Sequence, residues 1–445
     1  MDVVTRIPPS PTGHLHIGTA RTALFNYLFA RKHGGRMVMR SEDTDRARST
    51  RAFEEEIREG LAWLGITPDS FSRQSERSAL YRTYLEKIIA ADRAYVSKEE
   101  SKNEPGTMVE VVRLRNPNAE ITFHDEIRGD ITFDTTELGD FVIARNLDDA
   151  LYHFAVVVDD FESAVTHVIR GEDHISNTPR QILIQEAIGA HRPIYAHLPL
   201  ILAPDRSKMS KRHGAVALCD YQEKGYVPAA IVNYLALLGW NPGTEQELFS
   251  MEELIEAFDL TKIQKSGAIF NIEKLNWFNR EYLKLAPDTV FAAPLQKALR
   301  ERYVGVAIDA RSESRILALA RDRAVILSDI ARDVEAGEYD FAFVAPTPTK
   351  ELLAWKKDTD PKDAVPRLAH VSTLLENAQD SSDPEVIKAL IWPYAEEVGK
   401  GEVLWPLRVA LSGKEKSPDP FTLIATIGIP EAVARIKNAC ATLEG

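Results

Sequence analysis

The first forty residues alternate between short apolar runs and a helix-like repeat. Residues 3–7 are β-branched and apolar, which suits a buried parallel strand. From Ala20 to Arg31 the apolar positions recur at intervals of three and four residues, and the repeat stops at Gly34. Residues 36–40 form a second short run of the buried-strand kind. The pattern predicts a strand, a tight turn, an amphipathic helix and a second strand.

Further helices and strands follow in the same alternating order. A helix is expected over about 50–64, and Ser75 is expected to cap the next helix. Residues 165–170 and 198–202 again have the apolar character of buried strands. This alternation predicts an α/β fold with a doubly wound parallel sheet of the Rossmann type, whose ligands bind at the carboxyl edge of the strands.

Two regions depart from this alternation. Between about 95 and 149 the pattern is β-rich, with glycine–aspartate turns between strands expected at 109–114, 121–124, 131–133 and 141–143. From residue 228 onward helical periodicity dominates, with helices expected over 228–239 and 272–285 and a capping box at Ser250. The chain is therefore expected to end in all-α domains.

Composition narrows the class of protein. A chain of 445 residues exceeds what one hydrophobic core usually supports, so two to four domains are expected. The formal net charge of −13 argues against a nucleic-acid partner on its face, but phosphate binding depends on the local potential. No apolar run reaches the roughly 18 residues of a membrane span, and the chain opens on a strand rather than a basic signal sequence. We therefore expect no membrane partner and a cytoplasmic location.

Cysteine usage bears on metal binding. The chain has two cysteines, Cys219 and Cys440, which are far apart in the sequence. Two are too few for a disulfide framework or a thiolate zinc site. We therefore expect no structural zinc and no other structural metal.

Two polar segments carry candidate chemistry. The turn before the first helix contains His16 and Gly18, where unpaired helix amides attract phosphate and His16 is expected to supply a donor imidazole. The loop after residue 202 holds Lys208, Lys211 and Arg212, cations of the kind that neutralise a departing pyrophosphate. Taken separately, the two segments also fit an ordinary proline-rich turn and a solvated basic loop.

Together the two segments resemble the signatures of the class I aminoacyl-tRNA synthetases. Residues 9–18 read Pro-Ser-Pro-Thr-Gly-His-Leu-His-Ile-Gly, and residues 208–212 read Lys-Met-Ser-Lys-Arg. Among these enzymes the chain is most similar to bacterial glutamyl-tRNA synthetases. Further blocks of similarity lie at 40–49, 152–160, 166–174 and 405–413, with Ser41 where that family usually has isoleucine.

The resemblance implies a reaction and its partners. The expected reaction is ATP-dependent ligation of L-glutamate to the 3′-terminal adenosine of tRNA(Glu) through a glutamyl-adenylate, with release of pyrophosphate and AMP. Its substrates are ATP with Mg²⁺, L-glutamate and tRNA(Glu), and whether tRNA(Gln) is also charged stays open. A monomer is the family default.

Three other members of the wider family remain as alternatives. A glutaminyl-tRNA synthetase shares the signatures, but its C-terminal part is usually a β-barrel. A tRNA-modifying paralogue would lack the anticodon domain, which the length of this chain disfavours. An inactive relative that serves as an RNA-binding module is disfavoured because His16, Lys208 and Lys211 are intact.

The resemblance also implies roles for single residues. The catalytic residues are His16, Lys208 and Lys211. The implied ATP contacts are His16, Gly18, Asp173, Ile201, Lys208, Met209, Ser210, Lys211 and Arg212. The implied glutamate contacts are Arg6, Pro8, Ser10, Glu42, Tyr152, Val156 and Arg170. Arg170 is the first choice for the side-chain carboxylate, because a guanidinium offers a bidentate fork. His14 has no assigned role, and an exposed position is expected for it.

The same resemblance divides the chain into domains. Residues 1–94 and 151–203 are expected to form the two halves of the nucleotide-binding fold, and 95–150 an insertion that binds the acceptor end of tRNA. Residues 204–287 would contain the lysine loop and a helical connecting domain. Residues 288–365 and 366–445 would form two helical anticodon-binding subdomains.

Overall fold

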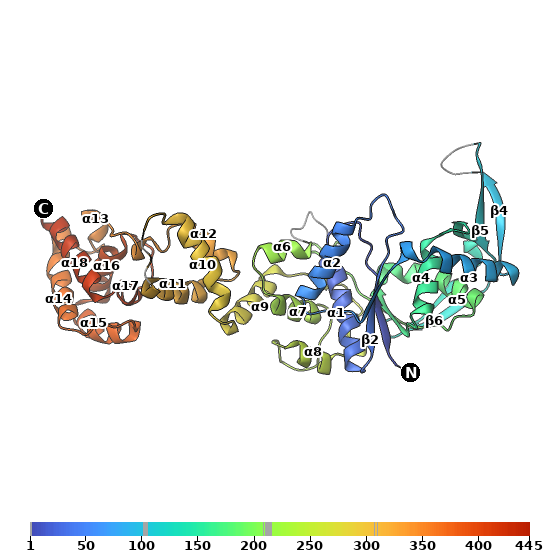
Figure 1. Ribbon diagram of the computed structural model, residues 1–445. Helices are drawn as coiled ribbons and strands as arrows, with labels where there is room; N and C mark the ends of the chain where they lie inside the picture. The colour runs from blue at the N-terminus through green and yellow to red at the C-terminus, as the bar shows by residue number, and fades with distance from the viewer. Residues whose placement is uncertain (1, 101–105, 208, 210–215, 307, 309) are drawn as a thin grey trace. The chain divides into compact units, whose positions relative to one another are not determined.

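The structure is a computed structural model that describes residues 2–100, 106–207, 209, 216–306, 308 and 310–445. The chain forms two compact units, Met1–Tyr282 and Leu283–Gly445. The first unit combines parallel and antiparallel strands with helices, and the regular elements described in the second unit are helices (Figure 1). The predicted fold class, an α/β part followed by all-α domains, is confirmed.

Five parallel strands form the centre of the first unit. Three of them pair in the order β1 (Val4–Ile7), β2 (Arg36–Ser41) and β3 (Ser70–Arg73). The other pair is β10 (His167–Gly171) and β11 (Ile194–Leu198). β10 lies beside β1, where the backbone N–H of Thr166 donates to the carbonyl of Val4. The order β3-β2-β1-β10-β11 is that of a doubly wound nucleotide-binding sheet.

Helices cover both faces of this sheet because successive strand residues point to opposite sides. Val4 and Val38 belong to the buried core that includes residues of α3 (Ser78–Ala90), α4 (Tyr152–Glu162) and α5 (Thr178–Ile188). On the other side, the hydroxyl of Thr5 donates to the carbonyl of Asn26 in α1 (Ile17–Lys32). The sequence pattern correctly predicts α1, and the helix expected over about 50–64 is α2 (Arg51–Trp63), with Thr50 as its N-cap.

Two of the sequence predictions about element ends are wrong. Ser75 does not cap α3, because it lies in a short 3₁₀ turn and donates its N–H and hydroxyl to the Asp43 carboxylate at 2.8 and 2.6 Å. The strand predicted over 198–202 is two strands. β11 ends at Leu198, and β12 (Ile201–Leu202) pairs with β13 (Ala268–Ile269). Pro199 separates them, since it has no N–H for a ladder.

The β-rich segment between β4 and β9 is attached to the central sheet. One antiparallel sheet contains β4 (Ala94–Glu100), β5 (Met108–Leu114), β8 (Phe141–Asn146) and β9 (Asp149–Ala150). The hairpin of β6 (Glu120–Asp125) and β7 (Gly129–Asp134) extends the central sheet, because β6 pairs in parallel with β11 at Asp125 and Tyr195. The strands predicted over 109–114, 121–124, 131–133 and 141–143 are confirmed.

The remaining described elements are mainly helical. In the first unit they include α6 (Leu218–Glu223), α7 (Pro228–Leu237), α8 (Met251–Ala257) and α9 (Ile272–Leu285), which runs into the second unit. The capping box predicted at Ser250 is present at the start of α8. Among the described residues, no helix has both the length and the apolar character that a membrane crossing requires.

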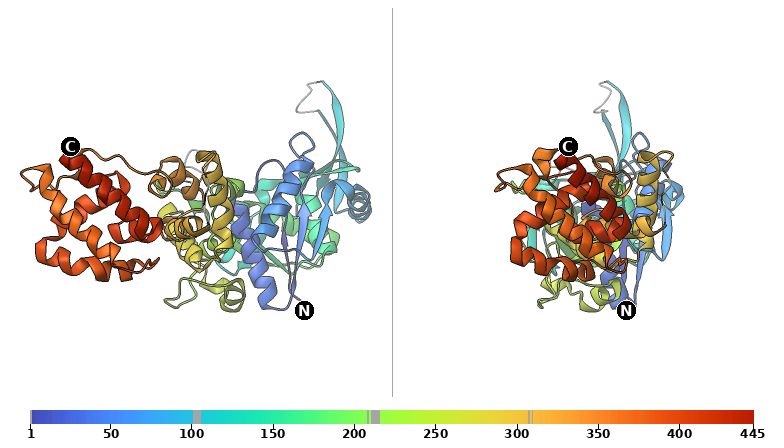
Figure 2. Two further views of the ribbon diagram at one scale, coloured as in Figure 1. Left: turned by 60° about the vertical axis from the view of Figure 1, so that its left-hand side comes forward. Right: turned by 90° about the vertical axis from the view of Figure 1, so that its left-hand side faces the viewer.

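The second unit is a helical assembly. Its α-helices are visible in both views of Figure 2, in yellow to red. They are α10 (Thr289–Arg302), α11 (Ala310–Arg323), α12 (Ser328–Glu335), α13 (Lys350–Leu353), α14 (Ala364–Glu376), α15 (Pro384–Val398), α16 (Lys400–Ser412), α17 (Pro420–Ile427) and α18 (Ile429–Glu444). Leu368, Leu407 and Ile436 are fully buried where α14, α16 and α18 pack together.

Candidate active site

A cavity of about 530 Å³ opens at the carboxyl ends of β1 and β10. The structure brings many of the expected site residues together in its lining: Arg6, Pro8, Ser10, His16, Gly18, Glu42, Tyr152, Arg170, Asp173, Ile201 and Met209. Val156 does not line this cavity; it is buried within α4. Lys208, Ser210, Lys211 and Arg212 lie outside the described residues, so their roles stay predictions.

His16 stands at the start of α1 and has a role that its sequence position did not suggest. It is the N-cap residue, and its Nδ1 accepts a hydrogen bond of 3.0 Å from the backbone N–H of Gly18. We expected a donor imidazole, whereas this nitrogen is an acceptor because it satisfies one of the unpaired amides of the helix start. In the neutral ring the proton is then on Nε2, so donation is assigned to that atom.

The segment that follows the lysine loop is fixed beside His16. The N–H of Ile17 donates to the carbonyl of Val216 at 3.0 Å, and the N–H of Leu218 donates to the carbonyl of Leu15 at 2.8 Å. Met209, on the other side of the loop, lines the cavity. Met209 and the segment that begins at Val216 therefore lie at the same edge of the sheet as His16, about two hundred residues away in the sequence, as the doubly wound topology predicts.

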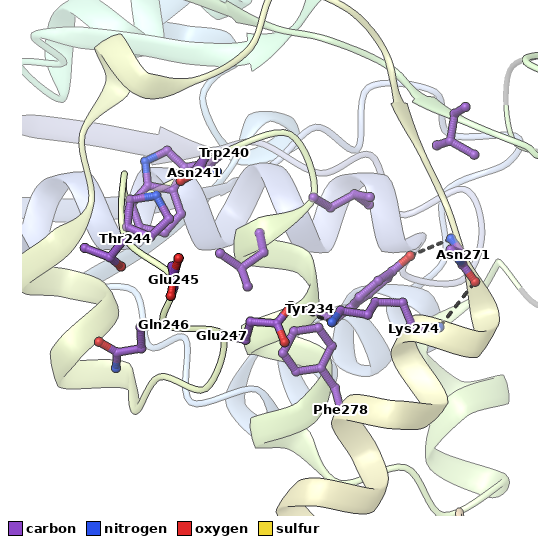
Figure 3. Close-up of a pocket in the computed structure, with 14 residues that line it drawn as sticks. Tyr234, Trp240, Asn241, Thr244, Glu245, Gln246, Glu247, Asn271, Lys274 and Phe278 are labelled. Atoms are coloured by element: carbon purple, nitrogen blue, oxygen red, sulfur yellow. Dashed lines mark hydrogen bonds and ion pairs between the residues drawn. The ribbon is translucent and has the colours of Figure 1, made fainter.

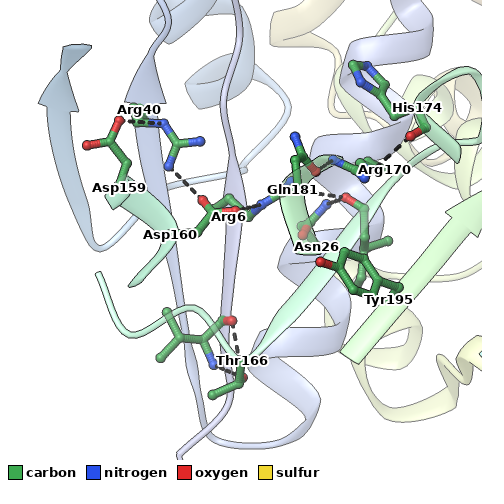
Figure 4. A network of polar contacts seen from close by, with 12 residues as sticks. Arg6, Asn26, Arg40, Asp159, Asp160, Thr166, Arg170, His174, Gln181 and Tyr195 are labelled. Carbon is green, nitrogen blue, oxygen red and sulfur yellow. Dashed lines mark hydrogen bonds and ion pairs between the residues drawn. The ribbon is translucent and has the colours of Figure 1, made fainter. Parts of the chain in front are cut away.

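A buried network of charges holds the base of the cavity (Figure 4). Arg40 is the centre of this network and contacts three carboxylates: Asp160 at 2.7 Å, Glu42 at 3.1 Å and Asp159 at 3.4 Å. Arg6 contacts Asp160 at 3.4 Å. Burial raises the pKa of Glu42, and the adjacent Arg40 counteracts this effect. The network fixes Arg6 and Glu42 at the cavity wall, because each is held by a buried partner of opposite charge.

Arg170 presents a buried positive charge to the same cavity. Its side chain donates to Gln181 Oε1 at 2.7 Å, to Thr178 Oγ1 at 2.8 Å and to His197 Nε2 at 3.1 Å. These partners are neutral, since burial lowers the pKa of His197 below its ordinary value. Burial and the nearby Arg6 also lower the pKa of Arg170. A guanidinium held in this way favours an anionic ligand over a neutral one.

The orientation of Arg170 depends on a carboxylate outside the cavity. Asp125 accepts hydrogen bonds from Nδ1 of His197 at 2.6 Å and from its backbone N–H at 3.0 Å. Burial alone would raise the pKa of Asp125, but the hydrogen bonds from His197 and from the backbone hold it below its usual value. Because Asp125 accepts the proton at Nδ1, Nε2 of His197 is left as the acceptor for Arg170.

Two further groups at the cavity are neutral at pH 7. Burial, followed by the charge of Glu42, raises the pKa of the Tyr152 hydroxyl to about 12. Burial, followed by the charge of Arg170, lowers the pKa of His174 to about 4. The Tyr152 hydroxyl lies 3.4 Å from Nδ1 of His174. Tyr152 therefore keeps its proton and remains a hydrogen-bond donor.

The sequence reasoning missed several residues of the lining. Thr19, Arg21, Thr22, His174 and Leu200 also line the cavity. Arg21 is buried in α1, donates to the carbonyls of Leu238 and Pro199, and has a pKa lowered to about 10 by burial. Its sequence position offered a signal, because Arg21 follows Ala20 in the apolar stripe of the predicted helix. An arginine in such a stripe is expected to be buried and to need hydrogen-bond acceptors.

A second cavity, of about 450 Å³, lies among α7, α9 and the loop after Trp240 (Figure 3). Tyr234 and Phe278 form part of its wall, and Lys274 contacts Glu247 at 2.6 Å. It contains no residue that the sequence analysis assigned to catalysis or binding. The expected site residues that are described therefore line the first cavity, except Val156, which is buried in α4.

Comparisons with known proteins show which family this chain belongs to. The catalytic-domain model of class I tRNA synthetases (E and Q) matches residues 2–104 and 97–277, and an anticodon-binding-domain model matches residues 273–440. The chain is 38% identical to the glutamate–tRNA ligase of Desulforamulus reducens, covering 99% of this chain and 100% of that one. It is 40% identical to that of Carboxydothermus hydrogenoformans, covering 98% and 99%.

A solved structure is similar over the same length. The crystal structure of a glutamate tRNA ligase from Elizabethkingia meningosepticum, in complex with its amino acid, has a TM-score of 0.86 and 34% sequence identity. Each chain is covered completely. Fold and site thus define a class I aminoacyl-tRNA synthetase of the glutamate and glutamine group. Within that group the chain belongs to the glutamate–tRNA ligases, which attach glutamate to tRNA at the expense of ATP.

Proposed function

We propose that this chain ligates L-glutamate to tRNA(Glu) at the cavity described above, in two steps. A carboxylate oxygen of glutamate attacks the α-phosphorus of ATP, and the bond from that phosphorus to the bridging oxygen breaks as pyrophosphate leaves. A ribose hydroxyl of the terminal adenosine of tRNA then attacks the acyl carbon, and AMP leaves. The observation that supports this most is that Arg170, Glu42 and the start of α1 share one cavity.

Glutamate is oriented by charge. The side-chain carboxylate pairs with Arg170 and Arg6, and Tyr152 adds a neutral donor. Glu42, at the cavity wall, receives the α-ammonium group. Glutamine is disfavoured because its neutral amide would leave the buried guanidinium of Arg170 without a counter-charge. Ser10 and Pro8 complete the wall on this side.

ATP is bound by the helix start and the lysine loop. The first amides of α1 and the Nε2 of His16 attract the phosphates, and Asp173, Ile201 and Met209 line the same cavity. Lys208 and Lys211 stabilise the negative charge that grows on the departing pyrophosphate, with Ser210 and Arg212 in the same loop. Mg²⁺ enters with ATP as part of the substrate. Little covalent chemistry is left to the protein, so positioning and charge stabilisation supply most of the acceleration.

The other domains bind tRNA. The β-rich segment 95–150 is assigned to the acceptor end and residues 288–365 and 366–445 to the anticodon, which the anticodon-domain match over 273–440 supports. We also infer that the protein is a monomer that acts in the cytoplasm with the translation machinery. Charging of purified tRNA(Glu) and tRNA(Gln) shows whether it accepts one or both.

ATP–pyrophosphate exchange tests the reaction directly. Labelled pyrophosphate should enter ATP only when glutamate is present, and the assay should include tRNA(Glu) so that a requirement for tRNA does not hide the activity. Glutamine and aspartate serve as controls. If glutamate causes no exchange and no charging of tRNA(Glu), the proposed reaction is wrong.

Arg170→Ala tests the assignment of the glutamate pocket. Loss of a buried charge pair should lower kcat/KM for glutamate by at least about 30-fold, which corresponds to about 2 kcal/mol. Arg192→Ala is the matched control, because Arg192 is an exposed arginine that precedes β11 and pairs with Glu186. Equal kinetics for wild type and Arg170→Ala would remove Arg170 from the pocket without affecting the reaction itself.

A further inference from the structure

Three potential metal ligands from separate elements converge outside the catalytic cavity. His14 lies in the turn before α1, Glu56 on α2 and Cys219 on α6. One ligand atom from each side chain lies within 4.8 Å of the other two. Nδ1 of His14 is already 2.7 Å from Oε2 of Glu56. None of the three lines the cavity assigned to glutamate and ATP.

The donor set matches one class of ion. Imidazole nitrogen, thiolate sulfur and carboxylate oxygen are the ligands of zinc, and three protein ligands leave a fourth tetrahedral position for water. Bond lengths of about 2.0–2.3 Å place the ligand atoms of such a site about 3.3–3.8 Å apart. His14 and Glu56 would separate slightly and Cys219 would approach. These are side-chain adjustments, and the half-exposed His14 side chain has room for them.

The backbones that carry these ligands are held together. Leu218, next to Cys219, donates its N–H to the carbonyl of Leu15, next to His14, at 2.8 Å. On α2, one turn after Glu56, a Cβ added to Gly60 would lie 3.0 Å from Leu15 and 3.2 Å from Leu218. α2 therefore approaches both neighbours so closely that a side chain at position 60 would require the two leucine methyl groups to shift. The ligands therefore stand on a fixed frame, which a preorganised site requires.

We propose that His14, Glu56 and Cys219 form a Zn²⁺ site with an open position for water. This proposal reverses the expectation of no metal, which rested on the number of cysteines and did not consider a mixed site with one cysteine. The contact between His14 and Glu56 is by itself an exposed pair of the kind that contributes little to stability. The third ligand distinguishes the cluster from such a pair. It also supplies a soft donor, which selects zinc over magnesium or calcium.

A zinc ion bound at this site would have a structural effect near the lysine loop. Cys219 lies on α6, a few residues after Lys211 in the sequence, and His14 lies two residues before His16. A bound ion would join the turn of the first signature, α2 and the segment after the lysine loop. It would therefore stabilise the junction of the two signature segments without contacting either substrate.

Cobalt absorption and zinc titration test the proposal. The protein, without an affinity tag and stripped of metal, is titrated with Co²⁺, which gives a thiolate charge-transfer band only when a cysteine is a ligand. Wild type should show this band and Cys219→Ser should not. Cys440→Ser is the matched control, because it removes the other cysteine, on α18. It should keep the band.

Zinc affinity, measured by competition with a chromophoric chelator, extends the test to the other ligands. Wild type and Cys440→Ser should bind one equivalent, and His14→Gln, Glu56→Gln and Cys219→Ser should each bind at least about tenfold more weakly. Zn²⁺ should raise the Tm of wild type by about 2 °C or more, but not that of Cys219→Ser. Circular dichroism of the metal-free variants shows whether each one folds.

Two results would overturn the site. The first is absence of the charge-transfer band in wild type, and the second is equal zinc affinity in wild type and Cys219→Ser. Both measurements are independent of aminoacylation, so they also distinguish failure of this site from failure of the proposed reaction.

Discussion

His16 caps a helix in addition to the role proposed for it with ATP. Its Nδ1 caps α1 by accepting from Gly18, and this leaves Nε2 as the atom that we propose donates to the phosphates. Sequence position suggested only the donor function. The cap could not be foreseen, because it depends on the extended backbone of His16, with φ −79° and ψ 143°, and on the rotamer of its side chain.

Two substitutions separate these functions. His16→Asn keeps a side-chain acceptor at the cap but removes the imidazole donor, so the free energy of unfolding should stay close to that of wild type. His16→Ala should lose about 1 kcal/mol as well, because the cap is gone. Both should lower kcat by about 10²-fold or more, since a donor to the phosphates is lost. Chemical denaturation and steady-state aminoacylation measure the two effects, and wild-type kcat in His16→Asn would contradict the donor role.

Single residues show where sequence reasoning about the site succeeds. Arg6, Glu42 and Arg170 were assigned by resemblance, and the structure brings them to one cavity because they stand at or near the ends of strands in a parallel sheet. Arg21 escaped notice because a charge in a helix is usually exposed, and here burial depends on carbonyl acceptors from distant segments. Val156 was also assigned by resemblance, but it is buried in α4 and does not line the cavity.

Strands and helices also differ in how well the sequence predicts them. Periodicity predicts α2 and α9, which have one buried face, and the capping box at Ser250 fixes the start of α8. The predictions of α1 and α7 are also correct, although both helices are buried on most sides. β4 was missed, since Ala94–Glu100 ends in charged residues and, within the described part of the chain, pairs with β5 alone. The break between β11 and β12 depends on a partner strand, Ala268–Ile269, that is far away in the sequence.

Pairing between strands links the β-rich segment to Arg170 in the proposed glutamate pocket. Asp125 ends β6, His197 lies in β11 and Arg170 in β10, and hydrogen bonds connect them in that order. The three side chains belong to three strands of one sheet. Asp125 therefore acts as a positioning residue for Arg170, through the tautomer of His197.

Asp125→Asn should disturb this series of hydrogen bonds while it changes few atoms. If the side-chain NH₂ of the asparagine faces Nδ1 of His197, it favours the tautomer of His197 that has its proton on Nε2. The N–H groups of His197 Nε2 and Arg170 would then face each other, and the hydrogen bond between them would be lost. We expect KM for glutamate to rise at least about tenfold and KM for ATP to change little. Asp130→Asn is the control, because it breaks an exposed pair with His124 on the same hairpin. Equal increases in both KM values would indicate general damage instead of repositioning of Arg170.

For the chain as a whole, the two units differ in their buried titratable groups. Burial lowers the pKa values of His153, His167, His174 and His197, and those of His153 and His174 fall to about 4. All four belong to the first unit. The second unit contains one histidine, the exposed His370. Titration of histidine therefore acts mainly on the first unit.

The sign of the effect follows from proton uptake. A histidine whose pKa is about 4 when folded and 6.5 when unfolded binds more protons in the unfolded state below pH 6.5. It stabilises the fold above that pH, and the stabilisation is lost progressively as the pH falls toward 4. His153 and His174 should each lower the free energy of unfolding by about 1–2 kcal/mol when the pH falls from 7 to 5. Glu42 and Asp159 oppose this trend. Burial raises their pKa values, so the folded state takes up protons more readily than the unfolded state as the pH falls. Their ion pairs with Arg40 reduce this effect.

Acidification from pH 7 to pH 5 should therefore destabilise the first unit selectively. Calorimetry of the full chain should show one transition moving to lower temperature while a second stays nearly fixed. Hydrogen exchange, corrected for the intrinsic effect of pH, should show loss of protection in peptides from 1–282 before those from 283–445. His153→Gln should reduce the pH dependence of the first transition, because one titrating group is removed. Equal loss of protection in both units would mean that groups other than the buried histidines control stability between pH 7 and pH 5.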